Sequence, residues 1–407
     1  MSNWRKGLHP ILPRNIFQLA EWLQSGVWTE ELKFKLSFAN VQNENIEETT
    51  HEIEAFGVQI RRGQRPNHSG EVEIEVHIVM GCPLFAANFT NVQYAFVDCT
   101  FDAVPNIKGA NQFFTLMVEY DGQYFPIAFS VMGKKTEEAY TAVLECIVLK
   151  LTPFLRPKMV MADFETPLQK AIAKVFPEAN TKGCWFHHNQ AIVRRCQRTS
   201  CFSKIKSRFP QHLEEAYRFQ RHLMNLSLLP PPFIEEAFEM LSMDLAKNSD
   251  LAGIFEDLCA YYKRFWILTK GPASFSVYRN TIRTNNPLER WNRTLKSAAS
   301  LKPEIGKFIV ALKRLVQSSY LDFLTLKQGN NPHRKRCAAT KNKDALLEKA
   351  WERLGELSLC NKEERVRRYR VFLEEVADQT VGGECDSDSR QNMQQDTDRM
   401  IEPVNEY

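Results

Sequence analysis

The sequence lacks the features that mark membrane-spanning, secreted and repeat-built proteins. No apolar run approaches the roughly 18–20 residues that a membrane-spanning helix needs, and the first six residues lack the apolar stretch of a signal peptide. The ten cysteines are scattered rather than gathered into a disulfide framework, and no internal repeat is visible. We therefore expect an intracellular protein with free thiols and no membrane partner.

What is present is an ordinary globular composition with unevenly placed charge. The 407 residues are 43% hydrophobic and 25% charged, with a formal net charge of only +4, and the length predicts two or three folded units. Basic residues nevertheless gather in segments 194–222, 279–314 and 327–370, the last including His-Arg-Lys-Arg at 333–336. Such segments are typical of proteins that bind a phosphate backbone, although solvated helix faces give the same pattern.

The middle of the sequence predicts an alternation of strands and helices. Predicted strands cover residues 92–98, 113–120, 123–131, 158–162 and 181–186, and predicted helices cover 135–151, 164–176 and the residues from 187 on. A turn is expected at 120–123 (Tyr-Asp-Gly-Gln). This βββαβαβα order is typical of an α/β fold with one mixed sheet flanked by helices, whose last two strands are parallel.

The flanking sequence completes a division of the chain into regions. A helix and a strand are expected near residues 16–23 and 72–79, and helices are expected over most of 198–276 and from residue 287. The regions are a mixed N-terminal part (1–90), the first part of an α/β domain (91–197), a helical stretch (198–278), the last part of that domain (279–326), a basic helical region (327–377) and an acidic disordered tail (378–407).

Two aspartates follow apolar strands directly. Asp98 ends the first strand of the α/β region, and Asp163 follows the strand over 158–162. If these strands are neighbours, both carboxylates lie at the edge where open sheets bind ligands, and a divalent cation would relieve their repulsion. The alternatives are a strand-end turn residue for Asp98 and a helix N-cap for Asp163.

Glu289 is the third candidate carboxylate. It lies in the segment Asn-Asn-Pro-Leu-Glu at 285–289, where Asn286 fits an N-cap, Pro287 the first helical position and Glu289 the third. That capping box is a strong alternative explanation for the glutamate. Glu289 nevertheless lies beside the apolar face of the predicted helix, so its side chain can also point into a cleft.

The segment Cys184-Trp185-Phe186-His187 raises the question of zinc. Cys196 and Cys201 are possible further ligands. The spacing is not that of a standard zinc finger, and core and turn positions are the alternative for these residues.

Five ordered blocks resemble the transposase domain of Mutator-like DNA transposons, over about residues 91–319. The blocks are Asp-Cys-Thr-Phe at 98–101 with Pro105, Gly-Lys-Lys-Thr-Glu-Glu-Ala-Tyr at 133–140, Asp-Phe-Glu at 163–165 with Ala171 and Phe-Pro at 176–177, Gly-Cys-Trp-Phe-His at 183–187 with Gln-Ala at 190–191, and Arg-Thr-Asn-Asn at 283–286 with Glu289. The resemblance implies a ribonuclease-H-like fold with a helical insertion before the last carboxylate.

The resemblance also implies a chemistry. In that family three carboxylates hold two Mg²⁺ or Mn²⁺ ions, and the corresponding residues are Asp98, Asp163 and Glu289. Cys184 and His187 correspond to a C-x-x-H motif near the active site. Two such ions cleave DNA phosphodiesters and support strand transfer. The arginines that we expect to hold DNA phosphates are Arg194, Arg195, Arg279, Arg283, Arg290 and Arg293.

Two departures from the family pattern leave the function open. Cys99 stands where the family commonly has glycine, although its side chain is expected on the opposite face of the strand from Asp98. Residues 1–81 contain no cysteine, whereas such transposases often carry a zinc-binding DNA reader upstream. The alternative to an active transposase is a domesticated, non-catalytic DNA-binding protein; a nuclease of the same fold acting on RNA–DNA hybrids or single strands is a third hypothesis. For the first two we expect DNA as partner, a homo-oligomer on DNA and a nuclear location.

Overall fold

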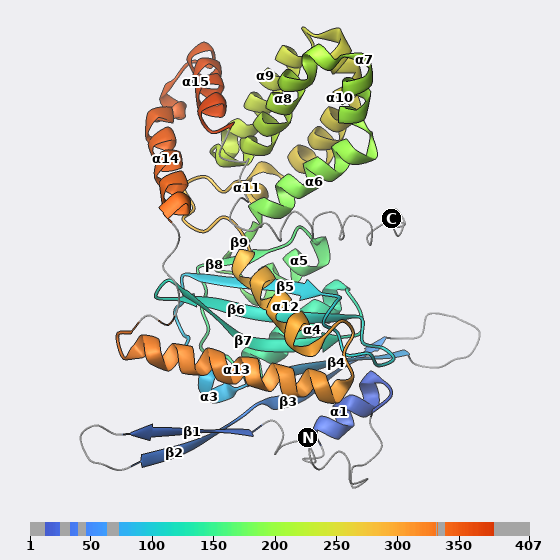
Figure 1. The fold of residues 1–407 in the computed structure, drawn as a ribbon, viewed down its shortest axis with the longest axis vertical. Coiled ribbons are helices and arrows are strands. Elements are labelled where there is room, and N and C mark those ends of the chain that lie inside the picture. The colour runs from blue at the N-terminus through green and yellow to red at the C-terminus, as the bar shows by residue number, and fades with distance from the viewer. Residues whose placement is uncertain are drawn as a thin grey trace. The chain divides into compact units, whose positions relative to one another are not determined.

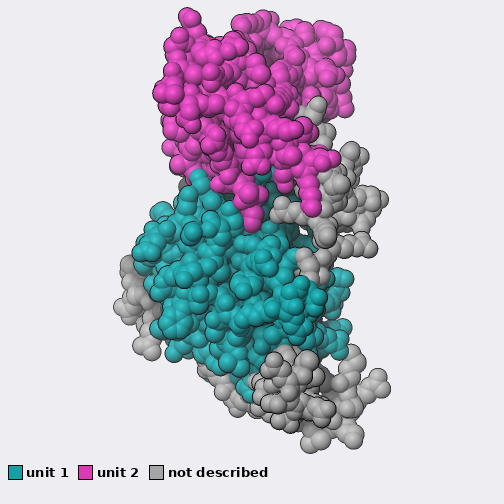
Figure 2. All heavy atoms as spheres, turned by 90° about the vertical axis from the view of Figure 1, so that its left-hand side faces the viewer, with its two compact units in different colours: residues 1–187, 283–334 teal, residues 188–282, 335–407 magenta. Residues whose placement is uncertain are grey.

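A computed structural model describes residues 13–24, 33–39, 46–62, 73–330, 332 and 338–377. The basic run at 333–336 and the acidic region from 378 lie outside these residues. The chain divides into two compact units, coloured separately in Figure 2: unit 1 comprises residues 1–187 and 283–334, and unit 2 comprises residues 188–282 and 335–407. None of the described helices combines the length and apolar character that crossing a bilayer requires.

Unit 1 is built on a seven-stranded mixed sheet with the order β3-β4-β7-β6-β5-β8-β9 (Figure 1). Its strands are β3 (Glu54–Arg62), β4 (Glu73–Gly81), β5 (Tyr94–Thr100), β6 (Gln112–Tyr120), β7 (Gln123–Met132), β8 (Met159–Ala162) and β9 (Asn180–Gly183). Strands β5, β8 and β9 are parallel, and the other pairings are antiparallel. The predicted mixed α/β sheet, with parallel final strands, is confirmed. A separate two-stranded sheet pairs β1 (Lys33–Ala39) with β2 (Ile46–Glu52).

The centre of the sheet is buried on both faces. Strand β6 is apolar and buried over most of its length, as expected for a strand covered on both sides. The predicted turn joins it to β7, with Asp121 and Gly122 both at positive φ (50° and 74°), which is the backbone of a type I′ hairpin. Strands β3 and β4 extend this same sheet from the N-terminal part of the chain.

Different helices cover the two faces of the sheet. Helices α12 (Asn286–Ala299) and α13 (Ile305–Lys327) cross one face, as Figure 1 shows, where Trp291 stacks on Phe129 with ring centroids 5.7 Å apart. Helix α4 (Glu137–Lys150) covers the other face, where the Tyr140 hydroxyl lies 3.8 Å from Cys99 Sγ. The remaining helices of this unit are α1 (Ile16–Gln24), α3 (Pro83–Ala86) and α5 (Thr166–Val175).

The described part of unit 2 is helical. Its elements are most of α6 (Trp185–Arg198), α7 (Cys201–Arg208), α8 (Leu213–Asn225), α9 (Ile234–Leu245), α10 (Ser249–Tyr261), a π-helical segment (Tyr262–Lys270), α11 (Pro272–Phe275), α14 (Ala338–Leu354) and α15 (Lys362–Glu375), with short 3₁₀ turns between them. The C-terminal helices pack on the others: Trp351 Nε1 donates to the Leu228 carbonyl at 2.8 Å, and Asn225 Nδ2 donates to the Val376 carbonyl at 2.9 Å.

Much of the positive charge on α15 is paired within unit 2. Arg365 bonds both carboxylate oxygens of Glu236, at 2.7 and 2.9 Å, and Arg370 contacts Asp244 at 2.9 Å. Arg367 and Arg368 share Glu364. These guanidinium groups therefore form ion pairs within α15 and between α15 and α9. Because they are paired, they are less available to bind a polyanion than the run of basic residues suggests.

The predicted strand over 181–186 is wrong at its C-terminal end. Strand β9 ends at Gly183, and α6 already begins at Trp185, whose backbone N–H donates to the Arg283 carbonyl at 2.9 Å. The chain turns at Gly183, where the ring of Phe164 packs so closely that any Cβ would overlap it. This close approach fixes β9 against the residue that follows Asp163.

The substitution Gly183→Ala is therefore expected to destabilise the protein by about 1–3 kcal/mol, because the added methyl group displaces Phe164. Differential scanning calorimetry measures the effect. The matched control is Gly253→Ala in α10, where a Cβ meets no atom within 4 Å and alanine is expected to stabilise by about 0.5–1 kcal/mol. A Gly183→Ala protein as stable as the parent would contradict the described packing.

Candidate active site

The pairing of β5 with β8 places Asp98 level with Asp163. The two strands are parallel, with Phe96 opposite Met161. Asp98 and Asp163 each come two residues later, so the register brings both to the C-terminal edge of the sheet. Asp163 lies just beyond the end of β8 and precedes α5, whose N-cap is Glu165, so the N-cap alternative for Asp163 is wrong. Asp98 lies within β5 rather than in a turn.

Neighbouring side chains alternate between the two faces of the sheet at this edge. Asp98 points to the face covered by α12, where Asn292 Nδ2 donates to its Oδ2 at 3.1 Å. Cys99 points to the face covered by α4 and Tyr140. Cys99 therefore lies on the opposite face of the strand from the Asp98 carboxylate, as the strand periodicity predicts.

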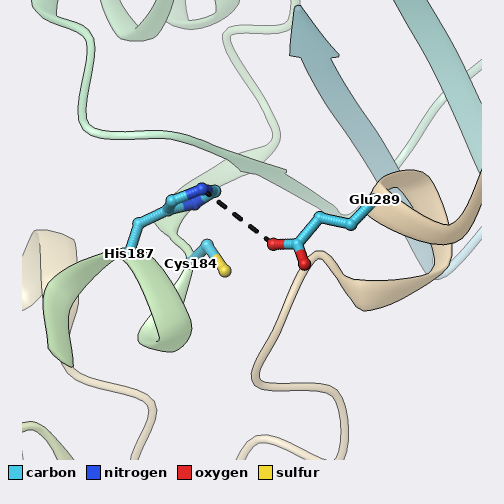
Figure 3. Close-up of side chains that lie close together, drawn as sticks. All are labelled: Cys184, His187 and Glu289. Carbon is cyan, nitrogen blue, oxygen red and sulfur yellow. Dashed lines mark ion pairs between the residues drawn. The ribbon is translucent and has the colours of Figure 1, made fainter. Parts of the chain in front are cut away.

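Glu289 does not cap its own helix. The N-cap of α12 is Asn285, whose side chain makes no capping hydrogen bond, and its backbone N–H donates to Cys184 Sγ at 3.2 Å rather than to the glutamate. Glu289 Oε1 is buried without a hydrogen-bond partner and lies 4.0 Å from His187 Nε2. The capping-box alternative is wrong, and the carboxylate points toward His187 (Figure 3).

The first turn of α6 brings Cys184 and His187 to the same place. His187 Nδ1 is 3.7 Å from Asp163 Oδ1, while its Nε2 faces Glu289. Cys184 is fully buried, immediately before the helix. One ligand atom from each of Cys184, His187 and Glu289 lies within 4.8 Å of the other two, and Figure 3 shows these side chains converging. The motif at 184–187 thus lies beside the candidate carboxylates.

The electrostatics of the cluster follow from three acids and one base in a partly buried setting. Burial raises the pKa of Asp98 to about 7; His187 opposes this rise, and the negative charges of Asp163 and Glu289 add to it. Burial also raises the pKa of Glu289. Burial alone would lower the pKa of His187, but its hydrogen bond with Cys184 and the charge of Asp163 outweigh that effect and raise the pKa to about 10. The imidazolium therefore compensates part of the negative charge.

The three carboxylates suit a divalent cation by their chemistry, whereas among the described residues the ligand atoms that already lie within 4.8 Å of one another are those of Cys184, His187 and Glu289. Asp98, Asp163 and Glu289 offer the carboxylate oxygens that Mg²⁺ and Mn²⁺ prefer. Glu289 Oε1 and Asn292 Oδ1 are buried acceptors without a hydrogen-bond partner, and such atoms are costly unless a ligand satisfies them. Burial is the main cause of the raised pKa of Asp98, and the charges of Asp163 and Glu289 add to it; a cation would offset both effects.

The candidate arginines divide between the two units. Arg283, Arg290 and Arg293 belong to unit 1 with the carboxylates, and the side chains of Arg290 and Arg293 are exposed on α12. The other three belong to unit 2: Arg194, Arg195 and Arg279. Arg195 pairs with Asp257 at 2.7 Å. Among the candidate arginines, Arg283 and the two on α12 are thus the ones that share a unit with the site.

Cys196 and Cys201 are not part of the cluster. Both are buried in unit 2, where Cys201 Sγ contacts the Thr199 hydroxyl at 3.0 Å. The sequence-based pairing of these cysteines with Cys184 and His187 in one zinc site is therefore unsupported by the positions of the side chains.

Two contacts of the site were missed by sequence reasoning. Asn292 holds Asp98, and Lys296 Nζ bonds Asp102 Oδ2 at 2.6 Å, which ties α12 to the loop after β5. The helical spacing could have indicated these residues, because Asn292 and Lys296 follow Glu289 by three and seven residues and so lie on the same face of the helix. Their partners on β5 and the following loop are nearly 200 residues away, so no local pattern identifies them.

Comparison with known families adds an independent observation. Residues 94–191 match the family model described as the MULE transposase domain. This chain carries a Mutator-like transposase domain. The match includes Asp98, Asp163, Cys184 and His187, whereas Glu289 lies beyond it. A search of curated proteins finds no match to the chain. The transposase domain indicates a transposase-related function with DNA as substrate, and the resemblance predicted from the sequence blocks is confirmed.

The raised pKa of Asp98 predicts a specific pH dependence of stability. At pH below about 4 this carboxyl group is protonated in both the folded and unfolded protein; between about 4 and 7 only the unfolded protein ionises, so stability falls through that window. Asp98→Asn lacks this loss, and at pH 8 its free energy of unfolding should exceed that of the parent by on the order of 1 kcal/mol, or ~2–4 °C in Tm.

Thermal unfolding from pH 4 to pH 8 measures the difference, which should grow with pH and then become level. Mg²⁺ should raise the Tm of the parent at pH 8 and have little effect on Asp98→Asn, since a cation bound only by the folded protein stabilises it. A difference between the two proteins that does not change with pH would contradict the electrostatic account.

Proposed function

We propose that this chain is a DNA transposase of the DDE type, which cleaves and joins DNA strands with Mg²⁺ or Mn²⁺ held by Asp98, Asp163 and Glu289. One observation carries the proposal: the register of β5 and β8 puts two aspartates side by side, and α12 presents a glutamate to the histidine that contacts the second aspartate. The transposase-domain match supports the same reading. The finer fold that we propose is ribonuclease-H-like, with unit 2 containing the helical insertion.

The chain's own residues prepare the site for that reaction. Asn292 fixes the orientation of the Asp98 carboxylate, and the Phe164 backbone N–H donates to Asp163 Oδ1 at 2.6 Å. When bound, two Mg²⁺ ions would activate the attacking water or 3′-hydroxyl and stabilise the leaving oxygen. Arg283, Arg290 and Arg293 hold DNA phosphates near the carboxylates.

The alternative function is DNA binding without catalysis, in a domesticated descendant of a transposase. The motivation is that residues 1–81 contain no cysteine, so this segment offers no thiolate ligands for a zinc-binding reader of transposon ends. Both functions share DNA as partner, and for both we propose a nuclear location and assembly as a homo-oligomer on DNA. They differ in whether the carboxylates are needed, which decides the experiment.

The decisive assay is nicking of supercoiled DNA by the purified chain with Mg²⁺ or Mn²⁺. Asp98→Asn, Asp163→Asn and Glu289→Gln are each expected to lower the rate on the order of 10²–10³-fold or more, as loss of a preorganised charge-stabilising group does. The matched control is Glu165→Gln. This side chain accepts a hydrogen bond from Tyr140 at 3.1 Å, which glutamine can also accept, so near-parental activity is expected.

DNA binding, measured alongside, separates the two functions. The transposase proposal predicts that the three carboxylate variants still bind DNA but do not nick it. Parental protein that binds DNA tightly and never nicks it would support the non-catalytic alternative. Nicking that persists at the parental rate in all three variants would refute the assignment of the site.

The arginines on α12 generate a separate prediction about DNA affinity. Arg290→Ala and Arg293→Ala should each weaken binding uniformly across sequences and reduce the slope of log K against log salt by about one. Arg156→Ala is the control, because this exposed residue precedes β8 and so lies at the opposite edge of the sheet from Asp163. Fluorescence anisotropy over a salt series measures the slopes, and equal slopes for all three variants would rule out an α12 interface.

A further inference from the structure

The cluster beside the candidate magnesium ligands contains donors that magnesium does not prefer. Cys184 offers a thiolate, His187 an imidazole nitrogen and Glu289 a carboxylate oxygen, all within 4.8 Å of one another. Sulfur and nitrogen ligands are typical of zinc and related transition metals, whereas magnesium takes oxygen ligands. The same glutamate thus belongs to two donor sets with different metal preferences.

We propose that Cys184, His187 and Glu289 form a zinc site, and that zinc bound there inhibits the magnesium-dependent reaction by withdrawing Glu289 from the other carboxylates. The zinc site itself stands on the donor geometry alone. Its inhibitory effect rests on the proposed function, because it requires Glu289 to serve the DNA reaction.

The geometry needs only a small adjustment to accept the ion. Ligand atoms at 2.0–2.3 Å from one tetrahedral ion lie roughly 3.3–3.8 Å apart, so a contraction of about 1 Å closes the set. His187 and Glu289 are already 4.0 Å apart. Three protein ligands leave a fourth position for water, which is the arrangement of an accessible zinc site rather than a closed structural one.

The surroundings of the cluster supply the support that zinc ligands usually have. If Nε2 of His187 binds the ion, Nδ1 faces Asp163 Oδ1 at 3.7 Å and is buried without a hydrogen-bond partner. A carboxylate beside the second ring nitrogen is the usual partner of a zinc-bound histidine. On the third ligand, Glu289 Oε1 is likewise buried and unpartnered. The Asn285 backbone N–H donates to Cys184 Sγ at 3.2 Å, which fixes the position of the sulfur.

Zinc and magnesium therefore compete for two of the three acids. Zinc takes Glu289 as a ligand and holds Asp163 as the partner of His187, which leaves Asp98 as the carboxylate that zinc does not engage. Because thiolate and imidazole bind zinc far better than magnesium, low concentrations of zinc should act against a large excess of magnesium.

The test measures zinc binding directly, without DNA. The full chain is treated with chelator, equilibrated with zinc chloride and dialysed, and bound zinc is counted by elemental mass spectrometry. Cobalt chloride is the spectroscopic probe, because a thiolate ligand gives Co²⁺ an intense near-ultraviolet charge-transfer band. The parent and the control Cys146→Ser, in which the lost thiol lies on α4, should hold one ion and show the band.

The variants identify the ligands. Cys184→Ser should lose the charge-transfer band. Asp163→Asn removes only the carboxylate that supports His187, so it should weaken zinc binding about 10–100-fold. His187→Gln removes a ligand and should weaken zinc binding by more than that. Circular dichroism verifies folding; if the buried Cys184→Ser protein does not fold, His187→Gln and Asp163→Asn decide. No zinc retained by the parent, or a band that survives Cys184→Ser, would overturn the site.

Inhibition is tested separately in the nicking assay with excess Mg²⁺, each variant being compared with its own zinc-free rate. Zinc should slow nicking by the parent and by Cys146→Ser. In His187→Gln, which keeps Asp163, the zinc concentration that gives half inhibition should rise at least about tenfold, because this variant binds zinc more weakly. Zinc that binds the parent without slowing nicking would overturn the inhibitory role. Absence of nicking in zinc-free parent would refute the proposed function while the binding result stands.

Discussion

The parallel pairing of β5 with β8 is the constraint on which the site depends. It holds two carboxylates level at one edge of the sheet, where burial disfavours the charge of Asp98. Helix α12 then completes the cluster, because Trp291 stacks on the sheet while Asn292 reaches Asp98 and Glu289 reaches toward His187. Elements far apart in the sequence thus fix each acid, and no single loop sets the geometry.

The positive charge of His187 offsets part of the negative charge of these acids. With an imidazolium between Asp163 and Glu289, the folded protein tolerates three acids close together at a partly buried edge of the sheet. The histidine is therefore a charge partner of the acids in the cation-free protein and a possible ligand for a softer metal. The two roles follow from the same position at the start of α6, where Cys184 supplies the sulfur that distinguishes zinc from magnesium.

The sequence could predict what depends on local pattern and strand order. Apolar runs and a two-residue turn were enough for β5 to β8, and strand alternation predicted that Asp98 and Cys99 face opposite sides. The role of Glu289 could not be decided from the sequence, because Asn, Pro and Glu at the start of a helix fit a capping box as well as a catalytic position. Pairings such as Arg365 with Glu236, which neutralise the basic run, join residues over a hundred positions apart and leave no local signal. The joining of β3 and β4 to the central sheet was hidden for the same reason.

Anomalous X-ray scattering from crystals soaked in Mn²⁺ tests the central claim most directly, because it locates the ion without relying on activity. The account predicts an anomalous peak within coordinating distance of the Asp98, Asp163 and Glu289 carboxylates, and its loss in crystals of Asp98→Asn. No peak at these carboxylates in soaked crystals of the parent, or one unchanged by Asp98→Asn, would contradict the claim that they form one metal-binding site.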